Sequence, residues 1–132
     1  MKGRTGVFVA LGALLLLLAG SVRAHHNMSA AFDFNDRVAL TGTMTKLDWR
    51  NPHIYVFVDA KREGDKMETW SIEGPAPTWF RSRDIPRSEF ETAIGKTITA
   101  EASRARDGSR SGLIRTITLP GGKVISLCPQ NC

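Results

Sequence analysis

Residues 38–49 have the sequence Val-Ala-Leu-Thr-Gly-Thr-Met-Thr-Lys-Leu-Asp-Trp, a Thr-rich segment in which apolar and polar residues alternate weakly. Such alternation, with β-branched side chains, is typical of a strand. Gly42 interrupts the segment, and a glycine inside a strand favours a sharp bend because it has no Cβ. The sequence therefore predicts one long strand, bent at Gly42, that takes part in both halves of a small barrel.

Five more segments have strand patterns and are separated by turn residues: 53–60, 67–73, 96–104, 113–119 and 123–127. In the first of them Ile54, Val56 and Val58 share one face, which we expect to be buried. In the next, Trp70 and Ile72 are core candidates. Between residues 73 and 96 the sequence predicts one short helix over residues 79–83, with Thr78 as its N-cap.

This order of elements predicts a mostly β fold, a small five- to six-stranded OB-like barrel with one short helix between strands three and four. Closure of the sheet removes the open strand edges that antiparallel sheets otherwise expose. A two-sheet sandwich is the alternative. We assign the barrel domain to residues 37–127, between an N-terminal arm at 25–36 and a C-terminal tail at 128–132.

The N-terminus has the three parts of a secretory signal peptide at residues 1–24. Lys2 and Arg4 precede a charge-free apolar block at residues 7–19, which is shorter than the ~20 residues that a spanning helix needs. Small side chains at Val22 and Ala24 favour cleavage after Ala24. We therefore expect an exported, periplasmic protein with no stable membrane anchor after processing; a retained anchor is the alternative.

Cleavage also changes the electrostatic character of the chain. The 132 residues carry a formal charge of +5, and removal of Lys2, Arg4 and Arg23 lowers it to +2. An almost balanced exported domain has little electrostatic attraction for nucleic acid. The composition therefore argues against a nucleic-acid partner.

Several segments resemble an uncharacterised family of exported bacterial proteins, a domain of unknown function. They include the His-His mature start, a Trp-x-Asn-Pro-His motif and a Trp-Ser-Ile-Glu segment, at His25-His26, Trp49–His53 and Trp70–Glu73. The resemblance implies a small OB-type barrel in the periplasm and implies no activity. Family members usually have Ser and an aromatic residue where this chain has Asn27 and Met28, and the C-terminal cysteines are not part of the pattern.

All three histidines lie in two short segments, His25-His26 and His53. After cleavage His25 would offer both an α-amine and an imidazole, and with His26 or His53 it would form the nitrogen-rich ligand set that tetragonal Cu(II) accepts. Met28 adds a thioether, which favours Cu(I). The sequence thus raises copper as a possible cofactor, with solvated terminal histidines and a turn-packing His53 as the alternative.

Other residues suggest binding or structural roles. Trp49, Tyr55 and Trp70 are candidates for an aromatic ligand groove, although core packing is the alternative for at least half of the aromatic residues. Cys128 and Cys132 are expected to form a disulfide in an oxidising compartment; a thiolate metal site is the alternative. The Arg-rich run at 81–87 is interpreted as a solvated face, with docking of an acidic partner as the alternative.

The sequence contains no nucleophile motif, phosphate-binding loop or redox pair, so we predict that the protein is not an enzyme. The leading hypothesis is an exported, non-enzymatic β-barrel that binds an envelope protein or a small ligand. The first alternative is a periplasmic copper-binding protein. The second alternative is a structural accessory of the cell envelope.

Overall fold

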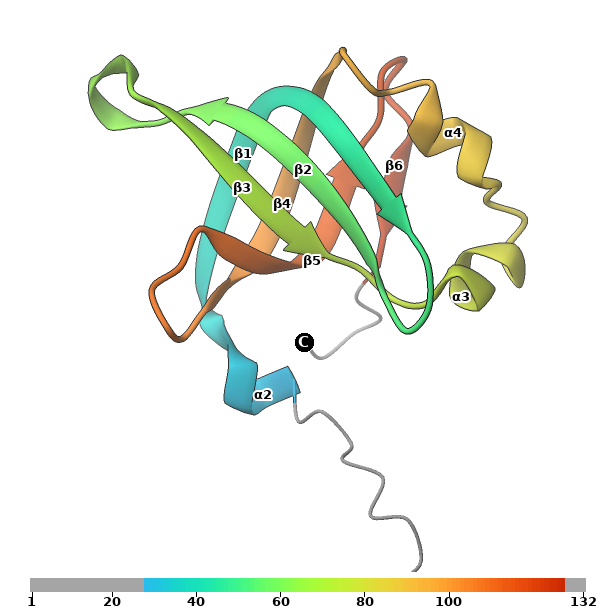
Figure 1. Ribbon diagram of the computed structural model, residues 1–132, viewed down its shortest axis with the longest axis horizontal. Coiled ribbons are helices and arrows are strands. Elements are labelled where there is room, and N and C mark those ends of the chain that lie inside the picture. The colour runs from blue at the N-terminus through green and yellow to red at the C-terminus, as the bar shows by residue number, and fades with distance from the viewer. Residues whose placement is uncertain (1–27, 128–132) are drawn as a thin grey trace, which may run out of the picture.

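The structure, a computed structural model, describes residues 28–127 and is mostly β, as the sequence predicted (Figure 1). Its six strands are β1 (Phe32–Trp49), β2 (Ile54–Lys61), β3 (Met67–Glu73), β4 (Thr97–Ala105), β5 (Ser111–Thr118) and β6 (Val124–Ser126). Its helices are all short: α2 (Met28–Ala31), the 3-10 helix η1 (Glu63–Asp65), α3 (Pro77–Arg81) and α4 (Arg87–Glu91).

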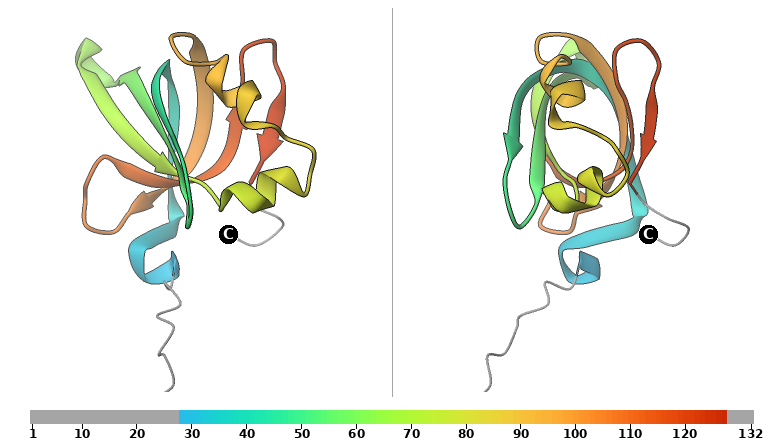
Figure 2. Two further views of the ribbon diagram at one scale, coloured as in Figure 1. Left: turned by 45° about the vertical axis from the view of Figure 1, so that its right-hand side comes forward. Right: turned by 90° about the vertical axis from the view of Figure 1, so that its right-hand side faces the viewer.

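The strands form one sheet in the order β3-β2-β1-β4-β5-β6, in which every neighbouring pair is antiparallel. An additional parallel pairing joins Ser71–Glu73 of β3 to Ser111–Leu113 of β5. This pairing closes β1 to β5 into a ring, which is close to the predicted barrel and is visible end-on in Figure 2. β6 pairs with β5 outside the ring.

β1 joins the two halves of the ring, because it pairs with β4 along its first part and with β2 along its second. Gly42 lies where the two pairings meet, opposite Ala60 of β2 and Ile98 of β4. A Cβ at Gly42 would lie 2.1 Å from the carbonyl oxygen of Asp59, so only glycine permits this approach of the two backbones. The expected role of Gly42 in a long, bent first strand thus has a steric basis.

β1 begins at Phe32, well before the expected Val38, so it includes part of the segment assigned above to an N-terminal arm. The β1–β4 register is irregular between Asp33 and Arg37, which interrupts the alternation that a strand pattern depends on. Phe32 is buried, and the next residues of β1 that reach the core come only after this irregularity, at Val38, Leu40 and Met44. The start of the strand was therefore hidden by a local break in its period.

The core fills the ring with the apolar residues that the alternating patterns indicated. Ile54, Val56 and Val58 of β2 are fully buried, and Trp70 and Ile72 of β3 are 2% and 0% exposed. β1, β4 and β5 contribute further buried residues, among them Leu40, Met44, Ile98, Ile114 and Ile117. The predicted faces of β2 and β3 are confirmed.

The prediction of one helix between strands three and four is wrong, because two short helices lie there, across one open end of the ring (Figure 2). The first begins at Pro77, with Ala76 and not Thr78 as N-cap. The second follows Pro86 and buries Phe90. It is only five residues long, too short for an apolar period to be seen in the sequence. Tertiary packing of Phe80 and Phe90, and not helix propensity, stabilises both.

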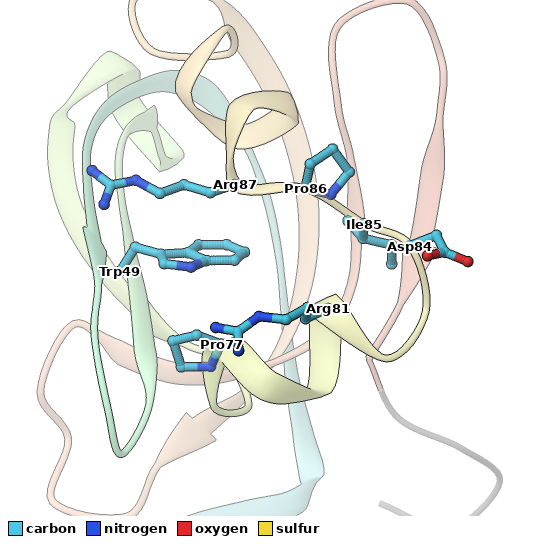
Figure 3. A pocket seen from close by; sticks show the side chains of 7 residues that line it. All are labelled: Trp49, Pro77, Arg81, Asp84, Ile85, Pro86 and Arg87. Atoms are coloured by element: carbon cyan, nitrogen blue, oxygen red, sulfur yellow. The ribbon is translucent and has the colours of Figure 1, made fainter.

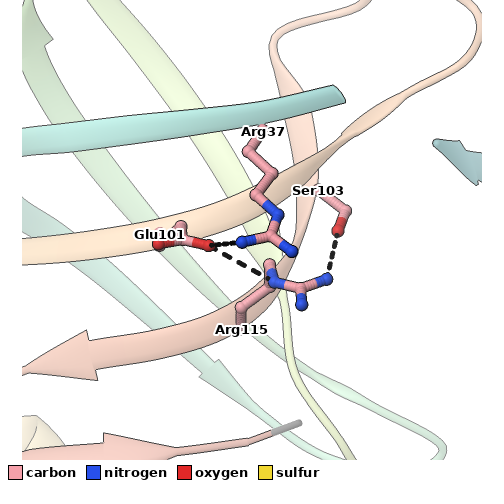
Figure 4. Close-up of polar contacts among 4 residues, drawn as sticks. All are labelled: Arg37, Glu101, Ser103 and Arg115. Carbon is pink, nitrogen blue, oxygen red and sulfur yellow. Dashed lines mark hydrogen bonds and ion pairs between the residues drawn. The ribbon is translucent and has the colours of Figure 1, made fainter. Parts of the chain in front are cut away.

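A polar network on the outer face joins three strands of the ring (Figure 4). The guanidinium groups of Arg37 on β1 and Arg115 on β5 each lie 3.3 Å from the same carboxylate oxygen of Glu101 on β4. Arg115 also donates to the buried hydroxyl of Ser103, at 3.3 Å. The network spans a register irregularity between Glu101 and Ala102, where the β4–β5 ladder is interrupted.

We predict that Gly42→Ala destabilises the protein by about 3 kcal/mol or more, because the new Cβ would overlap backbone that cannot rotate away. The matched control is Gly95→Ala. Gly95 has a positive φ of 81° and nothing within 4 Å of a built Cβ, so its cost is limited to roughly 1–2 kcal/mol for a left-handed alanine. Chemical unfolding measures both. An equal or smaller loss for Gly42→Ala would contradict the steric account.

Candidate functional site

A cleft of about 470 Å³ lies between the end of β1 and the two helices α3 and α4 (Figure 3). Its volume is within the range of small-molecule sites in proteins, roughly 300–1,000 Å³. We name it the Trp49 cleft, and its lining residues are Trp49, Pro77, Arg81, Asp84, Ile85, Pro86 and Arg87.

Trp49 is the last residue of β1 and is held in place by the aromatic residues that the two helices bury. Its ring centroid lies 4.8 Å from that of Phe80 and 5.3 Å from that of Phe90, and the two phenylalanines are 5.4 Å apart. Both phenylalanines are fully buried, so their side chains are fixed by the core. The indole is therefore a preformed surface of the cleft.

Charged side chains surround this indole. Figure 3 shows the side chains of Arg81 and Arg87 extending on opposite sides of Trp49, while the carboxylate of Asp84 points away from it. Arg87 is engaged, since its Nε lies 2.7 Å from the carboxylate of Glu91. Arg81 has no carboxylate partner among residues 28–127. The Arg-rich run that we interpreted as a solvated face thus contributes two side chains to a cleft.

A second group of polar side chains lies on the outer surface of β1, β2 and β3. Nδ1 of His53 contacts Oε1 of Glu73, and the hydroxyl of Tyr55 is hydrogen-bonded to the same carboxylate. The strand register explains the arrangement, because Tyr55 lies opposite Asp48 on one side and Glu73 on the other. We name His53, Tyr55 and Glu73 the His53 cluster.

The His53 cluster changes the acidity of its tyrosine. Partial burial raises the pKa of Tyr55, and the charge and hydrogen bond of Glu73 raise it further. Asp48 adds a smaller increase, and Arg50 opposes it. Arg50 is itself paired with Asp48 at 2.7 Å. The phenol is therefore kept protonated by its surroundings.

A cavity of about 260 Å³ lies beside the cluster, and both Met28 and His53 line it. The other lining residues are apolar or backbone in character: Gly74, Pro75, Leu113, Ile114 and Leu127. Two of the four predicted metal ligands are thus brought to one cavity, while His25 and His26 lie outside the described residues. Within residues 28–127 no group of three or more His, Cys, Asp or Glu side chains is placed to hold a metal ion.

The three aromatic residues predicted to bind a ligand are in different surroundings. Trp49 lines the cleft, and Tyr55 belongs to the outer-surface cluster. Trp70 is in the core, only 2% exposed, with its indole N–H donating to Glu68 at 3.2 Å. Of these three residues only Trp49 lines the cleft, so they do not share one groove there. The predicted disulfide of Cys128 and Cys132 lies outside the residues that the structure describes.

Two parts of these sites were missed from the sequence. Glu73 was not among the predicted site residues, although the β2–β3 register that sets it opposite Tyr55 could have indicated a role. The other missed part is the lining of the cleft. Because the sequence did not predict the second helix, it gave no reason to expect a cleft lined by Pro77, Ile85 and Pro86.

Residues 13–115 match a protein-family model described as "Family of unknown function (DUF6152)". No curated protein and no solved structure matches the chain. Among residues 28–127, no helix has the length and apolar character that crossing a membrane requires.

We predict that Glu73→Gln lowers the pKa of Tyr55 toward the ordinary tyrosine value, because it removes a negative charge beside the phenol. Tyr55 is the only tyrosine in the chain, so the absorbance of tyrosinate as a function of pH reports this group alone. Asp48→Asn, the matched control, should lower the pKa less.

The same shift has a consequence for stability. Because the folded protein holds the Tyr55 proton more tightly than the unfolded chain, stability should fall as pH rises above the ordinary tyrosine pKa of about 10. Glu73→Gln should weaken that fall. A Tyr55 titration midpoint that is unchanged or raised by Glu73→Gln would show that the carboxylate does not act on the phenol.

Proposed function

We propose that this chain, which belongs to the DUF6152 family of unknown function, is an exported, non-enzymatic binding module that holds a small ligand in the Trp49 cleft. The observation that carries this proposal is the cleft itself, a volume of about 470 Å³ beside an indole whose position is fixed from behind. Preformed concave sites with an aromatic surface and a few polar groups are the usual form of ligand sites.

The construction of the cleft supports a binding role. Pro77 and Pro86 have restricted backbones, and Ile85 adds apolar surface, so little order has to be gained when a ligand binds. Phe80 and Phe90 connect the indole to the core of the ring. A ligand would thus be held by stacking and by exclusion of water, without a chemical step.

Export is part of the same proposal. It is supported by Lys2 and Arg4, the apolar block at residues 7–19 and the small residues before His25. Mass spectrometry of the protein recovered from the periplasm should give a chain that begins at His25. A chain recovered there that still carries residues 1–24 would contradict the expected cleavage.

The cleft is tested with two flat probes, 2-naphthamide and 2-naphthoate, followed through the indole N–H resonances of the three tryptophans. We expect the Trp49 resonance to shift saturably and that of the buried Trp70 to stay unchanged. Trp49→Phe should weaken binding by about threefold to tenfold, because it reduces the aromatic contact. Trp79→Phe is the matched control, since Trp79 packs on Phe80 but does not line the cleft. Probes that move other resonances and leave Trp49 unchanged would contradict the proposal.

A second candidate function, copper binding, is favoured by one specific observation: Met28 and His53 line the same cavity. His26 is two residues before Met28 in the sequence. Contact of Glu73 with Nδ1 of His53 leaves Nε2 for a ligand, and a carboxylate in this position orients the imidazole and raises its basicity. We therefore propose His25, His26, His53 and Met28 as the ligand set of a copper site.

The copper site is tested by titrating the protein that begins at His25 with Cu(II), using calorimetry and electron paramagnetic resonance. His53→Ala should change the nitrogen hyperfine pattern and weaken binding, and Glu73→Gln should weaken it by roughly 10-fold to 100-fold. Tyr55→Phe is the matched control, since it alters the same cluster without removing an imidazole. A copper spectrum and affinity that are the same in wild type and His53→Ala would exclude His53 from the site.

A further inference from the structure

We infer that the ligand of the Trp49 cleft is a flat, apolar carboxylic acid, whose ring system stacks on Trp49 and whose carboxylate pairs with Arg81. This inference rests on the proposed function and specifies the chemistry of its ligand. Three observations carry it: the shape of the cleft, the pairing state of its arginines and the direction of its one carboxylate.

The shape of the cleft favours a flat apolar body. The indole of Trp49 lies between the side chains of Arg81 and Arg87 in Figure 3, with Pro77 beside it. Pro86 and Ile85 line the side toward the helix connection. Aromatic and proline surfaces of this kind pack well against planar rings, because contact is made over a whole face at low conformational cost.

The pairing state of the arginines favours an anionic group at one place. Arg87 is bound to Glu91 at 2.7 Å, so its charge is already compensated. Arg83, on the same segment, stacks over the ring of Trp79 at 4.0 Å and donates to the carbonyl oxygen of Trp79. Only Arg81 lines the cleft without a carboxylate partner among residues 28–127. Its planar guanidinium matches the geometry of a carboxylate.

The acidic residue of the cleft does not offset this charge. Asp84 has a left-handed backbone with φ of 54°, at the turn that follows α3. Its carboxylate points away from Trp49, whereas the side chain of Arg81 extends toward it (Figure 3). A cationic ligand on the indole would therefore meet the unpaired guanidinium of Arg81, and a neutral ligand would leave that guanidinium unpaired.

The test compares 2-naphthoate with its neutral isostere 2-naphthamide by calorimetry, in wild type, Arg81→Gln and Arg83→Gln. In wild type, naphthoate should bind about fivefold more tightly than naphthamide at low salt, the size expected for one partly exposed ion pair. Arg81→Gln should remove this preference, by lowering the affinity for naphthoate more than that for naphthamide. Arg83→Gln changes the net charge equally, on the same segment but outside the cleft, and should keep the preference.

The outcomes separate the ligand class from the proposed function. If both probes shift the Trp49 indole N–H and bind with equal affinity, the cleft is a ligand site and the carboxylate inference is wrong. If the preference is lost equally in Arg81→Gln and Arg83→Gln, a diffuse field and not Arg81 causes it, which also overturns the inference. If neither probe shifts Trp49, the proposed function itself fails. Unchanged unfolding curves for both variants exclude a loss of fold as the cause.

Discussion

The close approach of Gly42 to the carbonyl group of Asp59 is the constraint on which the rest of the structure depends. Because no Cβ stands between them, β1 can pair with β4 on one side of this point and with β2 on the other. The double pairing directs the end of β1 toward α3 and α4, so that Trp49 meets Phe80 and Phe90. The absence of a side chain at Gly42 thus determines where the cleft forms.

The turn that follows β1 connects the two candidate sites. Trp49, just before the turn, packs between the helices and lines the cleft. His53, just after the turn, contacts Glu73 on the outer surface. Strand alternation explains the division, since Asp48 and Tyr55 face outward where their neighbours Trp49 and Ile54 face inward. The Trp-x-Asn-Pro-His motif at residues 49–53 therefore contributes one residue to each site, and neither site uses the other's side chains.

Much of the fold could be predicted because its signals are local. The long first strand with Gly42 inside it, the buried faces of β2 and β3 and the order of the strands along the chain each follow from a short pattern. The start of β1 could not, because a register irregularity after Asp33 breaks the period. α4 could not, because one buried residue, Phe90, supplies its packing and no pattern arises from one residue. The cleft depends on α4 and was missed with it, while Trp49 itself was recognised as a candidate from its residue type.

The ring is closed where Ser71–Glu73 pair with Ser111–Leu113, a short parallel segment that joins two otherwise antiparallel arms of the sheet. Glu73 takes part in this parallel pairing through its backbone and in the His53 cluster through its carboxylate. A loss of this pairing would therefore also move the carboxylate that the imidazole and the phenol contact. Because Tyr55 is the only tyrosine in the chain and its pKa depends on this carboxylate, its ultraviolet absorbance at alkaline pH would report a separation of β3 from β5.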